Sequence, residues 1–157
     1  MKNHHYQTQL IWTGNRGTGT TSYRDYDRNY DILIKGKPVI SGSSDPAFLG
    51  DPQRHNPEEQ LVAALSSCHL LWYLHLCAKA GVVVTDYQDE ASGTMIENED
   101  GSGQFSEVTL RPQVTIREKE MIEKATELHD QAHQFCFIAR SVNFPIHHEA
   151  HILLKEK

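Results

Sequence analysis

The sequence has few cysteines and lacks the short motifs that most readily identify metal or redox enzymes. Its three cysteines, Cys68, Cys77 and Cys136, are odd in number and widely spaced, which excludes the disulfide framework of a small secreted protein. No CxxC and no HExxH motif occurs. We therefore expect an intracellular protein whose thiols are reduced.

Basic runs and a hydrophobic leader are also missing. No run of Lys or Arg exceeds two residues and the net charge is −6, so the chain has no electrostatic footprint for nucleic acid or an anionic membrane. The first residues lead into polar sequence without an apolar h-region, so we expect no signal peptide. With 38% hydrophobic and 23% charged residues, the composition is that of a soluble globular protein. We expect one domain over residues 1–157, cytoplasmic, with no nucleic-acid or membrane partner.

One long apolar stretch, residues 57–80, has the pattern of a buried helix. Asn56 precedes it as an N-cap, Glu59 completes a capping box, and Gly81 follows at the position where a left-handed residue ends a helix. The helix would be roughly 36 Å long. It is apolar on nearly every side, which is typical of a buried helix, and its serines, histidines and lysine argue against a membrane span. Cys68 lies in its middle.

The rest of the chain reads as strands with two further helical segments. Alternating apolar residues between 108 and 116 predict a half-buried strand, in which Pro112 indicates an edge or a bulge. The predicted strands are 6–13, 20–26, 30–35, 82–96, 108–116 and 145–154; the predicted helices are 57–80 and 118–134, with a short helix or turn at 136–142; the main turns and loops are 14–20, 41–55 and 97–103. The order β-β-β-α-β-β-α-β predicts an α+β fold with mainly antiparallel strands.

Two of the cysteines admit two interpretations. Most free cysteines are buried apolar residues, and the residues alone favour that interpretation for Cys68 and Cys136. The alternative is a peroxidatic pair, in which one thiolate attacks an O–O bond and the second thiol resolves the sulfenic acid as a disulfide. Cys77 is about 180° around the helix from Cys68 and is expected in the core.

The ten histidines suggest a competing zinc site. His129 and His133 share one helical face with Cys136, and Cys68 could supply a fourth ligand. The absence of any zinc motif makes this the weaker interpretation, and the expected metal content is none. His69 and His75 are expected to be hydrogen-bonded core or interface histidines, although His75 shares the face of Cys68.

The sequence NPEEQLVAALSSCH, followed by a second cysteine in HQFCFIARSV, resembles the OsmC/Ohr family of osmotically inducible and organic hydroperoxide resistance proteins. The resemblance covers nearly the whole chain. It implies strands around a long central helix that carries a cysteine, in an intertwined homodimer with sites at the subunit interface. It also implies a thiol peroxidase that reduces organic hydroperoxides with no bound cofactor and takes electrons from an external dithiol, such as a lipoyl-type thiol.

The resemblance also implies roles for individual residues. Cys68 matches the peroxidatic cysteine, Cys136 the resolving one, Glu58 the acidic residue and Arg16 the activating arginine. Chemistry agrees with an arginine, because Cys68 lies too far along its helix for the N-terminal dipole to stabilise a thiolate. A guanidinium stays charged in a dry site, and a carboxylate can hold it by a bidentate pair. The residues alone leave Arg24, Arg28, Arg54 and Arg140 open as alternatives to Arg16.

Helix geometry limits how Glu58 can serve the same site as Cys68. The two residues are roughly 15 Å apart along the axis and about 80° apart around it, so they cannot touch within one straight helix. A composite site, with Glu58 from a partner chain, is the simpler solution. An apolar substrate pocket would be lined by Leu71, Trp72 and His75.

Departures from the family pattern indicate a distinct OsmC-like subgroup. The chain has Ser66-Ser67 before Cys68, His69 after it, and Phe137-Ile138-Ala139 after Cys136. A further alternative is a non-catalytic member of the family that binds a small apolar or acyl ligand between its subunits.

Overall fold

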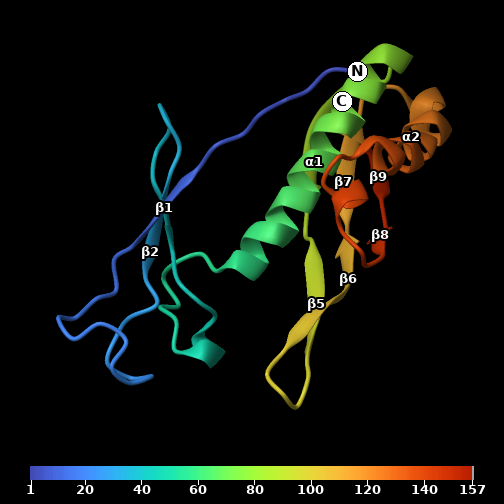
Figure 1. Ribbon diagram of the computed structural model, residues 1–157. Helices are drawn as coiled ribbons and strands as arrows, with labels where there is room; N and C mark the ends of the chain where they lie inside the picture. The colour runs from blue at the N-terminus through green and yellow to red at the C-terminus, as the bar shows by residue number, and fades with distance from the viewer. Residues whose placement is uncertain (157) are drawn as a thin grey trace. The chain divides into compact units, whose positions relative to one another are not determined.

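The computed structural model of the protein describes residues 1–156, which form two compact units, and the second unit begins at Val62. A single domain over 1–157 stays a prediction. The elements in chain order (Figure 1) are β1 (Gln9–Trp12), β2 (Tyr30–Leu33), β3 (Ile40–Gly42), η1 (Pro46–Phe48), α1 (Pro57–Ala80), β4 (Val84–Asp89), β5 (Ser92–Glu97), β6 (Gly103–Leu110), β7 (Pro112–Ile116), η2 (Lys119–Met121), α2 (Ile122–Phe135), η3 (Ala139–Ser141), β8 (Ile146–His148) and β9 (His151–Leu154).

The first unit is built on a three-stranded antiparallel sheet in the order β1-β2-β3. β1 and β2 fall inside two of the predicted strands, whereas the short β3 replaces the start of the predicted 41–55 loop. The start of α1 is tied to β2, because the side-chain amide of Gln60 donates to the Tyr30 hydroxyl at 3.1 Å.

The predicted strand at 20–26 is wrong. That segment consists of turns and bends, with one isolated bridge between Asn15 and Tyr26. The guanidinium of Arg28 lies over the rings of Tyr23 and Tyr26, 4.4 and 4.1 Å from their centroids, and donates to the carbonyls of the same two residues. These contacts draw the segment into a compact loop, which an extended strand cannot form.

The long helix α1 has the predicted bounds. The Asn56 side chain accepts a hydrogen bond from the Glu59 backbone at 2.8 Å, and the Glu59 carboxylate accepts one from the Asn56 backbone at 3.3 Å, so the capping box is formed. Gly81 ends the helix with a φ of 77°. By length and composition alone α1 could also cross a membrane, a test that the core helices of soluble proteins pass equally.

The second unit contains two three-stranded sheets, ordered β4-β7-β9 and β5-β6-β8. β5 and β6 form the predicted hairpin across the acidic turn (Figure 1), and β4 pairs with β7 in the antiparallel sense. The β6–β8 and β7–β9 pairs are parallel. Since the other pairs in the described chain are antiparallel, the predicted α+β fold with mainly antiparallel strands is confirmed.

Three predicted strands, 82–96, 108–116 and 145–154, are each divided into two shorter strands. Each divides at the same corner, where Arg111 donates to the Glu149 carboxylate at 3.2 Å, to the Ser92 hydroxyl at 2.8 Å and to the Glu90 carbonyl. The Asp89 carboxylate accepts the backbone N–H of Arg111. The chain therefore passes from one sheet into the other at this corner instead of continuing straight.

The core of the second unit lies between α1, α2 and the β4-β7-β9 sheet. The predicted alternation holds across the corner, because Val108, Leu110, Pro112, Val114 and Ile116 are all buried. α2 begins at Ile122 instead of 118, since a short 3₁₀ turn precedes it. The side chains that α2 buries are Ala125, Leu128, His129 and Ala132.

Candidate functional site

The structure brings the two cysteines of the predicted pair together. Cys68 is half-buried in the middle of α1, and Cys136 is buried at the C-terminal end of α2. Burial raises the pKa of the Cys136 thiol to about 11, and the neighbouring Cys68 thiol contributes to the rise. The backbone N–H of Ala139 donates to the Cys136 sulfur at 3.4 Å, and this hydrogen bond lowers the pKa of the thiol in part. The site thus combines one accessible thiol with one inaccessible, protonated thiol.

Cys77 is 1% exposed, and burial raises the pKa of its thiol. It packs in the core with Tyr73, so the expected core position of Cys77 is confirmed.

The residues expected to line a substrate pocket share one hollow. Leu71, Trp72 and His75 line a cavity of about 210 Å³ on α1. Phe135 and Phe137 were not predicted to lie beside this hollow; their rings contact Trp72 at 5.2 and 5.5 Å between centroids. These two phenylalanines flank Cys136, and that apolar flanking is the signal that could have found them. Binding of a substrate in this hollow stays a prediction.

Beside the cysteines, α1 and α2 share a buried pair of histidines. His69 follows Cys68 directly, and its Nε2 lies 3.0 Å from Nδ1 of His129. Both side chains are about 1% exposed, and the Tyr73 ring stacks on His129 at 3.8 Å between centroids. Burial lowers the pKa of His69 to about 4 and that of His129 to about 3, so the pair is neutral at pH 7. The expectation of a hydrogen-bonded core position for His69 is confirmed.

Two more histidines extend the cluster toward the surface. His148 on β8 lies 5.8 Å from the His69 ring and 5.7 Å from the His133 ring, and its Nε2 contacts the Asp130 carboxylate at 2.9 Å. The rings of His69 and His129 are within 7° of parallel with their centroids 5.3 Å apart, which is the arrangement of two coplanar rings joined by a hydrogen bond. Over residues 1–156, no three His, Cys, Asp or Glu side chains are grouped as metal ligands. The expected absence of a bound metal stays a prediction.

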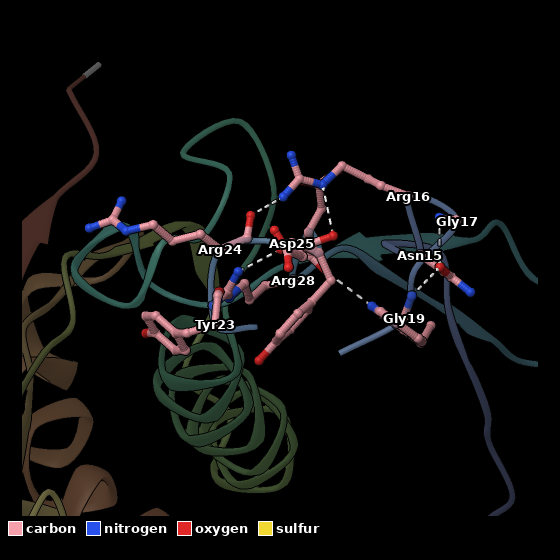
Figure 2. Close-up of polar contacts among 11 residues, drawn as sticks. Asn15, Arg16, Gly17, Gly19, Tyr23, Arg24, Asp25 and Arg28 are labelled. Atoms are coloured by element: carbon pink, nitrogen blue, oxygen red, sulfur yellow. Dashed lines mark hydrogen bonds and ion pairs between the residues drawn. The ribbon is translucent and has the colours of Figure 1, made fainter. Parts of the chain in front are cut away.

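The glycine-rich turn holds Arg16 within its own loop (Figure 2). The Arg16 guanidinium donates to the carbonyls of Arg24 and Asp25 and lies 3.7 Å from the Asp27 carboxylate. Asn15 caps the turn through hydrogen bonds from the backbone of Gly17 and Gly19. In the described chain the Arg24 guanidinium makes no hydrogen bond, and it points away from the others in Figure 2.

The other candidate arginines have structural partners. Arg28 is held by two tyrosine rings, Arg54 pairs with Asp31 and Asp51, and Arg140 donates to the carbonyl of Gln134.

Glu58 lies in the first turn of α1 with one buried carboxylate oxygen. Within residues 1–156 that oxygen, Oε2, has no hydrogen-bond partner, and Glu58 forms no ion pair. A buried carboxylate oxygen without a donor is costly, so this position suits an incoming cation. Glu58 and Arg16 belong to the first unit and the cysteines to the second. Their predicted roles as acidic and activating residues stay predictions.

The fold and the sequence define the class of the protein. The family described as OsmC-like protein matches residues 50–151, a span that contains both cysteines of the pair. The chain belongs to this family, as its helix and cysteine motifs predicted.

Individual relatives agree with this assignment. An OsmC-like protein of unknown function from Vibrio cholerae has 31% sequence identity, with 95% of this chain and 100% of that chain covered and a TM-score of 0.84. The uncharacterized protein YmaD of Bacillus subtilis is 24% identical over 90% of this chain and 89% of its own length. An organic hydroperoxide resistance protein from Elizabethkingia anophelis, at 18% identity, covers 98% of this chain and 100% of its own with a TM-score of 0.68, which shows a shared fold.

The histidine pair predicts a specific loss of stability in acid. The pKa values of His69 and His129 in the folded protein lie below the ordinary value of 6.5, so the unfolded chain binds more protons between pH 6.5 and about 4. The free energy of unfolding should therefore fall by roughly 2 kcal/mol or more across this range. Urea unfolding at half-unit pH intervals measures it.

A matched variant separates the contribution of the histidine pair to the loss of stability in acid from the contribution of the carboxylates. His69→Gln removes one titrating group, so its stability should decline less steeply with acid than that of the wild type. Equal slopes for the two proteins between pH 6.5 and 5 would contradict the assignment.

Proposed function

We propose that the protein is a thiol peroxidase that reduces organic hydroperoxides with Cys68 as the peroxidatic and Cys136 as the resolving cysteine. The observation that carries the proposal is the contact of an accessible thiol with a buried one in the interior of an OsmC-like fold. Some structural neighbours in this family are organic hydroperoxide resistance proteins, which supports hydroperoxides as the substrate class.

The proposed cycle needs no bound cofactor. The Cys68 thiolate attacks the distal oxygen of ROOH, the O–O bond breaks, and the alkoxide takes a proton and leaves as ROH. The sulfenic acid on Cys68 then reacts with the Cys136 thiol, forming the disulfide and releasing water. An external dithiol, such as a lipoyl-type thiol, reduces this disulfide by two exchange steps and becomes a disulfide itself. The protein would work in the cytoplasm, where such dithiols are kept reduced.

Burial divides the two roles between the cysteines. Cys136 is 1% exposed and its pKa is raised to about 11, so it is a poor first nucleophile at neutral pH. Cys68 is the thiol that a hydroperoxide can reach. The hollow of Leu71, Trp72 and His75 on the same helix offers an apolar surface for the organic group.

An intertwined homodimer accounts for the apolar surface of the chain. In the second unit Leu71 and Phe137 are each 67% exposed, and in the first unit Leu10 is 63% exposed. Large exposed apolar side chains in this number are typical of a surface that a partner covers. In such a dimer the partner's copy of the first unit can supply the Glu58 carboxylate and the Arg16 guanidinium, which agrees with the unpartnered Oε2 of Glu58.

Thiol counting tests the proposed cysteine roles. One equivalent of cumene hydroperoxide should remove two of the three thiols per chain from the reduced wild type within seconds, because the sulfenic acid is resolved at once. Cys68→Ser should keep its thiols and lose steady-state peroxidase activity by at least about 10³-fold. Cys136→Ser should gain oxygen atoms on Cys68, visible by intact-mass spectrometry.

Cys77→Ser is the matched control, because its thiol lies in the core, and it should retain the activity of the wild type. Equal peroxidase rates for the wild type and Cys68→Ser would overturn the enzymatic proposal. If the thiols are lost slowly while an apolar probe such as a fatty acid binds, the protein is a ligand-binding member of the family.

Arginine substitutions test the source of the cation. Arg16→Ala should reduce kcat/KM for cumene hydroperoxide by at least about 10²-fold, since it removes the proposed counter-charge of the thiolate. Arg16→Lys should recover little of the loss, because an ammonium cannot form the bidentate pair with Glu58. Arg24→Ala, in the same loop, is the control and should retain most of the activity. A larger loss in Arg24→Ala than in Arg16→Ala would reassign the role.

A further inference from the structure

We infer that the hydrogen bond between His69 and His129 is an acid-sensitive latch that positions Cys136 against Cys68. Both histidines are positioning residues: they act through the two helices and do not touch the reacting atoms. The inference rests on the proposed function, since it concerns the same pair of thiols.

The latch and a second buried hydrogen bond join α1 to α2 inside the core. The first is the His69–His129 contact at 3.0 Å, and the second is the Tyr73 hydroxyl, which donates to the carbonyl of Ala125 at 3.0 Å. All of these side chains are buried, so neither contact has water as a competing partner. Loss of a buried hydrogen bond leaves an unsatisfied group and costs more than the bond itself contributes.

The position of the latch couples it to the cysteines. His69 follows Cys68 in α1, and His129 lies in α2 two turns before Cys136, the residue that caps the C-terminal end of that helix. A helix transmits a displacement along its axis as a rigid element, so a shift of α2 at His129 moves the end of the helix that carries Cys136. The latch therefore fixes the distance across which the disulfide must form.

The surroundings of His129 indicate which of the two histidines donates the hydrogen bond. Nε2 of His129 is buried and has no hydrogen-bond partner in the described chain. A buried N–H without an acceptor is rarer in proteins than a buried acceptor without a donor. We therefore assign the proton to Nδ1 of His129, which donates to Nε2 of His69, and leave Nε2 of His129 unprotonated.

This arrangement explains why acid opens the latch. An added proton places a charge on one of two buried imidazoles: on His129 it creates a charged Nε2–H that no acceptor meets, and on His69 it occupies Nε2 and removes the acceptor of the hydrogen bond. The carboxylate beside this cluster offers little compensation, because Asp130 already contacts His148 at 2.9 Å. The other groups that face the pair are Tyr73 from α1, His133 from α2, His148 from β8 and, behind Tyr73, Tyr87 from β4.

Disulfide equilibria test the latch without any hydroperoxide. In a Cys77→Ser background, the equilibrium constant of the Cys68–Cys136 disulfide against dithiothreitol is measured at pH 7 and at pH 5, with selenocystamine to catalyse exchange in acid. Three variants are compared: His129→Asn, which keeps an N–H at the place of Nδ1; His129→Leu, which removes the donor; and His151→Asn, a control on an exposed histidine of β9.

The latch predicts a distinct result for each variant. At pH 7, His129→Leu should lower the disulfide equilibrium constant at least about tenfold, whereas His129→Asn and His151→Asn should stay within about threefold of the parent. From pH 7 to pH 5 the constant should fall severalfold more in the parent and in His151→Asn than in His129→Asn, since protonation of the Cys68 thiolate lowers it equally in all three. The ¹⁵N spectrum should show Nε2 of His129 unprotonated at pH 7.

Other outcomes overturn the inference. A folded His129→Leu protein with an unchanged constant would refute it, and so would an equal decline in acid for His129→Asn and the parent. If His129→Leu does not fold, the pH comparison with His129→Asn decides the question. If hydroperoxide fails to oxidise the protein while these equilibria behave as expected, the proposed function is wrong and the latch stands.

Discussion

The packing of α2 on α1 is the constraint on which the site depends. Tyr73 stacks on His129 and donates to the backbone of α2, and His69 holds His129 from the next turn. These contacts are dry and directional, so they define one register between two helices whose apolar residues alone would allow several. In that register the end of α2 delivers a buried thiol to the accessible thiol of α1. The chemistry proposed for the protein follows from this juxtaposition.

Much of this arrangement could be predicted from local signals. The capping box at Asn56, the left-handed glycine at 81 and the alternation from Val108 to Ile116 each reflect a short-range rule, and each appears as expected. The division of the long strands could not be predicted, because the alternation continues unchanged through Arg111. The bend there depends on Glu149 and Asp89, which are distant in sequence. The folded loop around Arg28 was missed for a different reason. Its contacts with Tyr23 and Tyr26 are short-range, but they are made by a side chain that folds back over the loop, which no strand or helix period reveals.

In the site, too, the features set by local sequence could be predicted and those set by long-range contacts could not. The sequence indicated Cys68 and Cys136 through family resemblance, and helical periodicity gave the core position of Cys77. The pairing of His69 with His129 joins residues that are sixty positions apart, and no spacing rule connects them. Periodicity instead grouped His129 with His133 and Cys136 as metal ligands. In the structure Nδ1 of His129 is instead hydrogen-bonded to His69, a residue of the other helix.

The central claim is that Cys68 and Cys136 form one redox pair within a single chain. Peptide mapping under non-reducing conditions, after one equivalent of cumene hydroperoxide and rapid alkylation of the remaining thiols, tests it most directly. We predict one disulfide-linked peptide pair, containing Cys68 and Cys136 of the same chain, with Cys77 alkylated after denaturation. Recovery of all three cysteines as alkylated thiols, or a disulfide that includes Cys77 or joins two chains, would contradict the account.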